Sequence, residues 1–249
     1  MAFTLLLAAG IVASVATHPV RAPALGQPMR FDADSIGEPM SSAPVELWRP
    51  PGVGPFPVVV LLAGCGGVGD SERHWAARLT GWGYAAAILD SLRPRHIKAR
   101  CGRSGVSTDL RAQDLANLVK FLRTAPGIAA DRIGVIGFSQ GSGAALFTAL
   151  EGVSIAPPFQ ALVAYYPGCR LPPRSHLSVD TLILFGADDN PASIERCKAM
   201  ALALRDTRHP AALIIYPHAT HNFDDTNSEA ATQSFAAAEA FLAEHLKAR

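Results

Sequence analysis

The stretch I-G-V-I-G-F-S-Q-G, residues 133–141, decides the fold. Its first four residues form a continuous apolar run, which is typical of a strand buried on both faces of a sheet. Its last five fit the pattern G-x-S-x-G, in which a serine stands on a sharp turn between a strand and a helix. Glycines at both ends of the pattern let the two backbones approach closely. The stretch predicts a nucleophile at Ser139, and the alternative is a Gly- and Ser-rich turn that only connects a strand to a helix.

Short β-rich runs alternate with longer segments of helical period on both sides of this stretch. The predicted strands are 45–49, 58–63, 84–89, 133–137, 161–166, 181–185 and 211–216, and the predicted helices are 71–82, 109–124, 140–151, 192–206 and 228–247. This alternation indicates an α/β fold, with a mostly parallel central β-sheet flanked by helices on both faces. In the helix over 109–124, we expect Leu110 on the buried face and Arg111 and Asp114 in water.

The composition indicates one globular domain. The chain has 249 residues, 49% of them hydrophobic, which is enough for a sizeable core. We therefore expect a single domain over residues 45–249. Because 22 Lys and Arg residues nearly balance 21 Asp and Glu residues, no strong field favours nucleic acid or an anionic membrane as partner. We expect a small-molecule substrate and, from the single-domain size, a monomer.

The N-terminus carries a feature of exported proteins. Residues 1–16 are an uncharged apolar run that ends in small residues, as a cleavable signal does. We expect a signal peptide over 1–22, an extended lead-in over 23–44, and a periplasmic or secreted protein. The alternatives are an uncleaved anchor, a mis-chosen start codon, and a buried helix in a cytoplasmic protein. Four cysteines favour disulfides only in an oxidising compartment, and their spacing leaves three pairing schemes open.

A serine hydroxyl needs a base to take its proton and a carboxylate to orient that base. The pair Asp188 and Asp189 follows one predicted strand, at the edge where α/β sheets build their sites, and His218 and His221 follow the next strand. Ser, acid, His is the chain order of hydrolases with a G-x-S-x-G turn. The residue pattern alone leaves the choice within each pair open. No metal-ligand motif such as H-E-x-x-H is present, so we predict neither a metal nor a cofactor.

Backbone N–H groups near the serine are expected to stabilise negative charge on a substrate oxygen. Gln140 N–H lies at the start of the following helix, and Cys65 N–H lies in the Gly-rich segment A-G-C-G-G, residues 63–67. The alternatives are a merely flexible loop and, for Cys65, a catalytic thiol. Arg93 and Arg95 follow another strand, where they are candidates to bind a substrate carboxylate or are simply solvated.

The sequence resembles the dienelactone hydrolase family from residue 57 to about residue 242. The matching stretches are P-V-V-V-L-L-A-G-C-G-G (57–67), L-D-S-L-R-P-R (89–95), D-R-I-G-V-I-G-F-S-Q-G (131–141), Y-Y-P-G-C (165–169), L-I-L-F-G-A-D-D (182–189) and H-A-T-H-N-F-D (218–224). The resemblance implies an α/β-hydrolase fold, with Ser139 as nucleophile, Asp189 as acid and His221 as base. It also implies hydrolysis of an ester or a lactone.

The chain departs from the founding members of this family at two positions. Those members are similar in using a cysteine nucleophile, where this chain has Ser139, and many relatives have histidine where it has Ala63. The serine favours a broader class of small carboxylic esters over dienelactone itself. A catalytically silent binding protein and a peptidase or amidase on the same fold are the alternative functions.

The resemblance also implies a disulfide pairing. In relatives with the same C-G-G loop, the counterparts of Cys65 and Cys101 look like partners, which leaves Cys169 and Cys197 to each other. The second bridge would then hold the loop that carries the acid.

Overall fold

The structure is a computed structural model and describes residues 29–31, 45–97, 101, 106–153, 159–172 and 174–246. The predicted signal peptide lies outside these ranges, as does the predicted lead-in except for residues 29–31. No helix within the described ranges is both long and apolar enough to cross a membrane.

The described strands form one eight-stranded sheet in the order β1-β2-β4-β3-β5-β6-β7-β8. Their bounds are β1 Met29–Phe31, β2 Val45–Trp48, β3 Phe56–Leu62, β4 Ala85–Leu89, β5 Ile128–Phe138, β6 Ala161–Tyr165, β7 Asp180–Gly186 and β8 Ala211–Tyr216. Pairing is antiparallel between β1 and β2 and between β2 and β4, and parallel everywhere else in the sheet. The predicted α/β class and mostly parallel sheet are confirmed, and β1 is a strand that the sequence did not predict.

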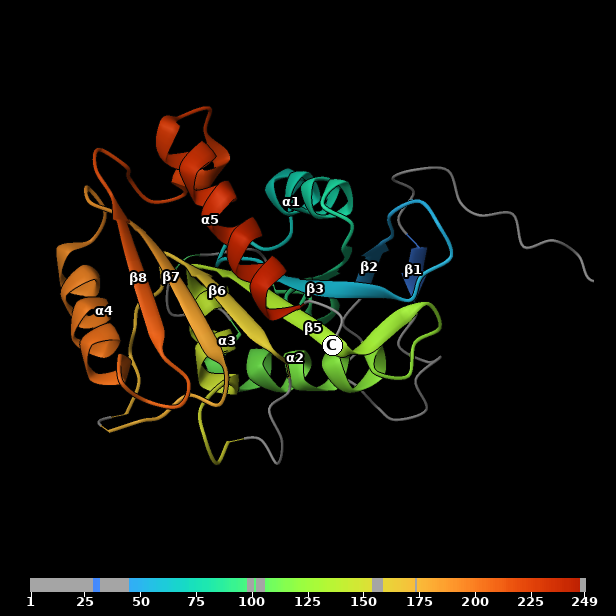
Figure 1. Cartoon of the computed structure of the whole chain (residues 1–249), viewed down its shortest axis with the longest axis horizontal. Coiled ribbons are helices and arrows are strands. Elements are labelled where there is room, and N and C mark those ends of the chain that lie inside the picture. The colour runs from blue at the N-terminus through green and yellow to red at the C-terminus, as the bar shows by residue number, and fades with distance from the viewer. Residues whose placement is uncertain are drawn as a thin grey trace, which may run out of the picture.

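Helices cover both faces of this sheet. They are α1 Asp70–Gly81, α2 Thr108–Leu122, α3 Gln140–Thr148, α4 Pro191–Leu204 and α5 Glu229–His245, with short 3₁₀ turns η2 Arg93–Arg95 and η3 Phe223–Asp225. Figure 1 shows α1 and α5 over one face, α2 and α3 over the other, and α4 beside β8. Three of the helices begin at a side-chain cap, in which Ser107, Asn190 or Ser228 accepts a backbone N–H of the first turn.

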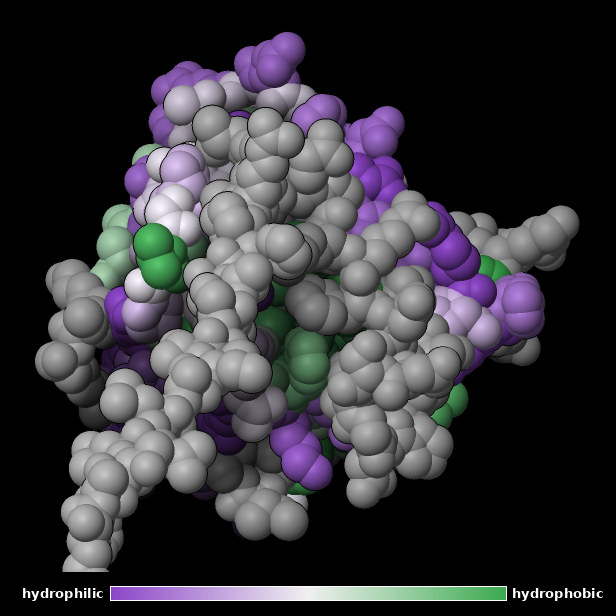
Figure 2. Space-filling model, turned by 90° about the vertical axis from the view of Figure 1, so that its right-hand side faces the viewer, coloured by the Kyte–Doolittle hydropathy of each residue, from purple (hydrophilic) through white to green (hydrophobic). Residues whose placement is uncertain are grey.

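The centre of the sheet is the core of the molecule. Val58 to Leu61 of β3 are fully buried, as are Ile133, Val135 and Ile136 of β5. Strands covered by helices on both faces have no solvent side, which explains why their sequences are continuous apolar runs. Figure 2 looks onto the end of the molecule that carries β1 and β2, where the coloured surface is hydrophilic around the rim and hydrophobic toward the centre.

The buried face of α2 differs from the prediction. Leu110 is 45% exposed, whereas Arg111 and Asp114 are each only 2% exposed. Arg111 lies four and seven residues before Leu115 and Leu118, so it belongs to the same apolar stripe. Arg111 and Asp114 can be buried because the Nη atoms of Arg111 and the carboxylate of Asp114 find partners on other segments, which are described below.

Candidate active site

Ser139 stands on the turn between β5 and α3. Its backbone is in an uncommon left-handed conformation, with φ 50° and ψ −110°, and its N–H donates to Tyr165 O at 3.0 Å. Two glycines make this turn possible. A Cβ on Gly137 would lie 2.7 Å from the Ser142 backbone, and a Cβ on Gly141 would collide with Leu62 O and Ala63 O. The pattern therefore places the serine hydroxyl at the carboxyl edge of the sheet.

The other two predicted residues come to the serine from the ends of β7 and β8. His221 Nε2 lies 3.1 Å from Ser139 Oγ, and His221 Nδ1 lies 2.7 Å from Asp189 Oδ2. The Asp189 side chain is 8% exposed and that of His221 44% exposed, so the carboxylate is shielded while the imidazole faces the cavity. Asp189 Oδ1 also accepts Asn190 N–H at 2.6 Å, which fixes the carboxylate.

The neighbouring members of the two pairs point elsewhere. The side chains of Asp188 and His218 are exposed and make no hydrogen bond to any described residue. Asp188 instead contributes its backbone, whose N–H donates to Ala219 O at 2.9 Å. A Cβ on Gly186 would collide with that same carbonyl, so the loops that carry Asp189 and His221 are packed backbone against backbone.

The Gly-rich loop after β3 lies against Ser139. A Cβ on Gly64 would lie 3.6 Å from Ser139 Cβ, which shows how closely the loop backbone approaches. Gln140 is the first residue of α3, where backbone N–H groups have no partner within the helix. Neither Gln140 N–H nor Cys65 N–H has an acceptor among the described residues. The two predicted donors are thus brought to the same site as Ser139.

Behind this loop lies Arg111, a residue that the sequence analysis assigned to solvent. Its guanidinium donates through Nη2 to Ala63 O and through Nη1 to Gln140 Oε1 at 3.2 Å. Burial lowers the pKa of Arg111 to about 10, against the opposing effect of the carboxylates of Asp114 and Asp90. The signal that could have found it is the spacing of the apolar stripe on α2.

Arg93 and Arg95 do not reach Ser139. Arg95 forms a two-pronged ion pair with Asp114, at 2.7 and 2.8 Å, and also donates to Ser91 O at 2.7 Å. The Arg93 side chain is 60% exposed, and its Nε lies 3.4 Å from Asp90 Oδ2. It lines a hollow of about 370 Å³ beside the Gly-rich loop, and Ser139 does not line this hollow.

Two hollows meet at Ser139. One, of about 670 Å³, contains His221, Asn222 and Tyr166 and is rimmed by acidic side chains of α1. The other, of about 340 Å³, is lined on its apolar side by Leu146, Phe147 and Leu171. Ser139 and the bridged residues Cys65 and Cys101 line both hollows. The site therefore offers two compartments of different size and polarity, with the serine at their junction.

A model of the dienelactone hydrolase family matches residues 44–246 of the chain. The chain belongs to the dienelactone hydrolase family. As a member of this family, the protein is a hydrolase that acts on ester bonds. No curated protein matches the chain at a significant level.

Solved structures share the fold of this dienelactone hydrolase family member. A dienelactone hydrolase candidate from Klebsiella pneumoniae is 21% identical, covers 88% of this chain and 98% of its own, and has a TM-score of 0.72. A propionate-bound esterase from Thermogutta terrifontis has 18% identity, 90% and 96% coverage, and a TM-score of 0.69. A dienelactone hydrolase-like promiscuous phosphotriesterase from metagenomic libraries has 20% identity, 89% and 99% coverage, and a TM-score of 0.71.

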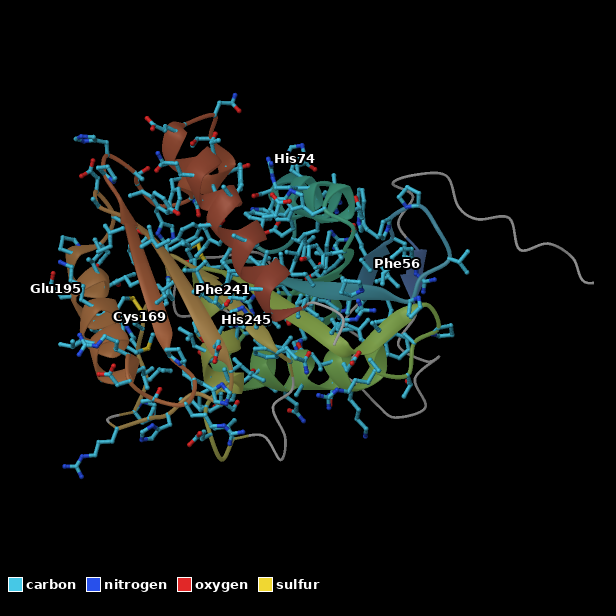
Figure 3. The ribbon with its side chains drawn as sticks, in the orientation of Figure 1. Phe56, His74, Cys169, Glu195, Phe241 and His245 are labelled. Atoms are coloured by element: carbon cyan, nitrogen blue, oxygen red, sulfur yellow. A yellow bond between two sulfur atoms is a disulfide. The ribbon has the colours of Figure 1, made fainter. Side chains whose placement is uncertain are left out.

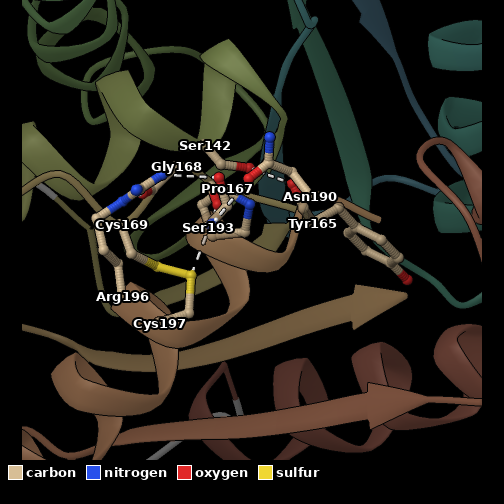
Figure 4. The surroundings of a disulfide bond; sticks show 9 residues. All are labelled: Ser142, Tyr165, Pro167, Gly168, Cys169, Asn190, Ser193, Arg196 and Cys197. Atoms are coloured by element: carbon tan, nitrogen blue, oxygen red, sulfur yellow. Dashed lines mark hydrogen bonds between the residues drawn. A yellow bond between two sulfur atoms is a disulfide. The ribbon is translucent and has the colours of Figure 1, made fainter. Parts of the chain in front are cut away.

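Both disulfides of this family member border the site. Cys65 is bonded to Cys101 with a Cα–Cα distance of 4.8 Å, and Cys169 to Cys197 with 5.2 Å. The second bridge ties the segment after β6 to α4, the helix that begins two residues after Asp189 (Figure 4). The two bridges fit an exported protein in an oxidising location.

The Arg196 side chain reinforces the second bridge. It donates to Gly168 O at 2.9 Å and to Ser193 Oγ at 2.8 Å, as the dashed lines of Figure 4 show. The second turn of α4 is therefore held to the segment after β6 by the covalent bond at Cys197 and the hydrogen bond from Arg196.

Asp224, the last residue of the family stretch H-A-T-H-N-F-D, has a structural role. Asp224 is 5% exposed, and its carboxylate accepts Trp75 Nε1–H at 2.9 Å and the Tyr166 hydroxyl at 2.7 Å. Burial raises the pKa of Asp224, and the two donated hydrogen bonds act in the opposite direction. Asp224 thus holds α1 and the segment after β6 to the loop that carries His221.

Two of the other described histidines bind a carboxylate away from Ser139. His209 and His245 bond the two oxygens of Asp180 at 2.9 and 3.1 Å, and Phe241 stacks on His245 with centroids 4.2 Å apart. Figure 3 shows Phe241 and His245 close together on α5, and His74 at the surface of α1. Among the described residues, no three His, Cys, Asp or Glu side chains gather as metal ligands do.

Proposed function

We propose that the protein hydrolyses small carboxylic esters or lactones through an acyl-enzyme on Ser139. The observation that carries this proposal is the chain of contacts from Ser139 Oγ to His221 Nε2, 3.1 Å, and from His221 Nδ1 to Asp189 Oδ2, 2.7 Å. In this arrangement His221 takes the serine proton while Asp189 keeps the imidazole in the tautomer with its hydrogen on Nδ1.

The reaction proceeds in two halves. Ser139 Oγ attacks the ester carbonyl, its proton passes to His221 Nε2, and the N–H groups of Cys65 and Gln140 stabilise the oxyanion. The C–O bond to the leaving alcohol breaks as His221 returns the proton to that oxygen. Water then attacks the acyl-enzyme with the same help, which releases the acid and restores the serine.

The two hollows favour one orientation of the substrate. The leaving oxygen must lie within reach of His221 Nε2, because that atom supplies its proton. The alcohol portion therefore belongs in the larger hollow, which contains His221, and the acyl chain in the smaller apolar hollow beside Gln140. Esters of short unbranched acids with a more polar alcohol fit this arrangement.

Hydrolysis of p-nitrophenyl acetate and butyrate by the purified mature chain tests the proposal. Ser139→Ala and His221→Gln are expected to lower kcat about 10⁴-fold or more, and Asp189→Asn about 10³- to 10⁴-fold. An organophosphonate probe should add its mass to Ser139 alone. A folded protein that neither turns over esters nor takes up the probe would contradict the proposal and favour a silent binding protein.

Each triad variant has a matched control in the neighbouring residue of the same type. Asp188→Asn and His218→Gln should keep the wild-type kcat, because both side chains are exposed and make no hydrogen bond among the described residues. Loss of activity in Asp188→Asn with retention in Asp189→Asn would reassign the acid.

Export of a single domain over residues 45–249 is a further part of this proposal. It is supported by the apolar run over residues 1–16 and by two disulfides. The mature chain isolated from a secreting host should begin near residue 23. An N-terminus at Met1, together with four free thiols in a non-reducing peptide map, would contradict it.

A further inference from the structure

Arg111 is the largest fully buried side chain among the described residues, and it carries a charge. Charges are costly to remove from water, and a buried ion pair often adds no stability over apolar residues of the same volume. Arg111 Nε lies buried with no hydrogen-bond partner. Stability alone therefore gives a poor account of an arginine at this position of α2.

The two hydrogen bonds of Arg111 explain better why an arginine stands at this position. Nη2 donates to Ala63 O, the carbonyl that immediately precedes Gly64 and Cys65, and Nη1 donates to Gln140 Oε1 at 3.2 Å. These acceptors belong to the two segments that carry the proposed oxyanion donors, the N–H groups of Cys65 and Gln140. The planar fork of a guanidinium spans both acceptors at a fixed separation, which a single ammonium group does not do.

The backbone segments around the Arg111 guanidinium are closely packed. Gly141 brings α3 so close to the end of β3 that an added Cβ would collide with Leu62 O and Ala63 O. From the other side, Asp114 is already held by Arg95 in a two-pronged ion pair. Arg111 therefore adds the link that closes the Gly-rich loop onto the start of α3.

We propose that Arg111 is a positioning residue that sets the distance between the two oxyanion donors, Cys65 N–H and Gln140 N–H. This inference deepens the proposed function and rests on it. Oxyanion donors act through geometry, because they must lie near 3 Å from an oxygen whose charge develops only in the transition state. An error in their spacing slows the chemical step and leaves binding of the planar ester nearly unchanged.

The test compares Arg111→Met, Arg111→Lys and Leu122→Ala. The last variant removes a fully buried side chain from the far end of the same helix and controls for general loosening of α2. The kcat is calculated per enzyme molecule that an organophosphonate labels. On this basis, Arg111→Met should lose about 10- to 100-fold in kcat, with KM changed by no more than about twofold. The kcat of Arg111→Lys should lie between those of Arg111→Met and wild type. Phenylboronic acid forms a tetrahedral adduct, and the affinity of the variants for it should decrease in parallel with kcat.

Hydrogen exchange measured by mass spectrometry supplies a readout that does not need turnover. Arg111→Met should raise exchange in the peptides over 62–67 and 138–142, and Leu122→Ala should not. If wild type hydrolyses no ester, the proposed function fails while this comparison still tests the link. Should the Arg111 variants not fold, Gln140→Ala breaks one of the two hydrogen bonds and should show the same split between kcat and KM to a smaller degree.

Four results would overturn the proposal. Arg111→Met could keep the wild-type kcat per labelled site. Leu122→Ala could lose as much kcat as Arg111→Met at the same loss of melting temperature. Exchange could stay unchanged in both peptides. A rise of KM at constant kcat would likewise overturn it, because it would assign Arg111 to substrate binding.

Discussion

The aromatic ring of Tyr166 lies with its centroid 4.5 Å from that of the His221 imidazole. Tyr166 has a positive φ of 40°, which turns the chain sharply after β6 and brings the ring against the imidazole of His221. Its hydroxyl is fixed by Asp224 at 2.7 Å, and burial raises its pKa well above the usual range, so it remains a protonated donor. His221 therefore has a packed aromatic surface as well as Asp189 to hold its orientation.

Substitutions of Tyr166 separate the ring from the hydroxyl. Tyr166→Ala removes the surface under the imidazole and should lower kcat about 10- to 100-fold, because a displaced base misses the serine proton. Tyr166→Phe keeps the ring, so kcat should stay near the wild-type value. It should cost about 1–3 kcal/mol in the free energy of unfolding, measured in urea, because Asp224 loses a buried donor. Equal kcat losses in the two variants would show that the hydroxyl, not the ring, supports the base.

Gly143 offers a direct probe of the smaller hollow. It lies in α3, lines that hollow, and a Cβ placed on it meets nothing within 4 Å. Gly143→Ala should therefore raise the free energy of unfolding by about 0.5–1 kcal/mol, as expected for a helix interior. Gly143→Leu should fill the hollow and lower kcat/KM for p-nitrophenyl butyrate about tenfold or more relative to acetate.

Gly66 offers the matching probe of the larger hollow. It lines that hollow, and a Cβ placed on it also meets nothing within 4 Å. Gly66→Leu should discriminate against bulky alcohols at constant acyl chain. If Gly143→Leu instead discriminated among alcohols, the proposed orientation of the substrate would be reversed.

Glu72 predicts an unusual pH dependence of stability. Burial raises the pKa of its carboxyl despite the hydrogen bond from Gly69 N–H at 2.8 Å, and Asp224 and Asp225 add to the effect. A carboxyl whose pKa is higher in the folded state contributes stability below its unfolded pKa of about 4.3 and loses that contribution as pH rises through the folded pKa. Glu72→Gln keeps the acceptor and removes the charge.

Glu72→Gln should therefore melt higher than wild type at pH 7–8, by about 2 °C or more, with the difference shrinking toward pH 4. Differential scanning calorimetry across this range measures it. A difference that grows toward acid pH would mean that the ionised carboxylate stabilises the folded protein.

The two disulfides should contribute similar stability but different activity. Their sequence separations are 36 and 28 residues, for which loop closure gives about 3–4 kcal/mol each. Replacing both cysteines of either bridge by alanine should lower the free energy of unfolding in urea by about this amount. At a temperature where both variants are folded, the Cys65/Cys101 variant should show the larger loss of kcat, because that bridge anchors the loop with a proposed oxyanion donor. A larger loss in the Cys169/Cys197 variant would make the acid-bearing loop the more sensitive part.

Local patterns were enough to predict the elements around the nucleophile. The turn at Ser139 depends on Gly137 and Gly141, whose contacts lie within the turn or on the adjacent strand, so a nine-residue stretch contains most of its determinants. Helix α1 was predicted over 71–82 and runs over Asp70–Gly81. For the acid and the base, residue patterns narrowed the candidates to pairs, and the choice within each pair depended on the resemblance to a family.

What the sequence did not predict depends on partners far along the chain. Arg111 is buried because Ala63 and Gln140, 48 and 29 residues away, accept its hydrogen bonds, and no local pattern records them. Arg95 was a candidate for binding a substrate carboxylate or for a solvated position, but it is held by Asp114, which lies 19 residues further along the chain. In both cases the charge indicated solvent or substrate, while the fold supplied a buried partner.

Because β8 lies at the edge of the sheet, loss of activity and loss of the fold are expected under different conditions. His221 follows this strand, whereas Ser139 follows β5 near the middle of the sheet. An edge strand is held by hydrogen bonds on one side only and opens at a lower free energy than the centre. Mild heat or denaturant should thus silence the enzyme while most of its fold persists. During synthesis, likewise, Ser139 leaves the ribosome well before His221, and under the proposed mechanism the nascent chain stays inactive until β8 has joined the sheet.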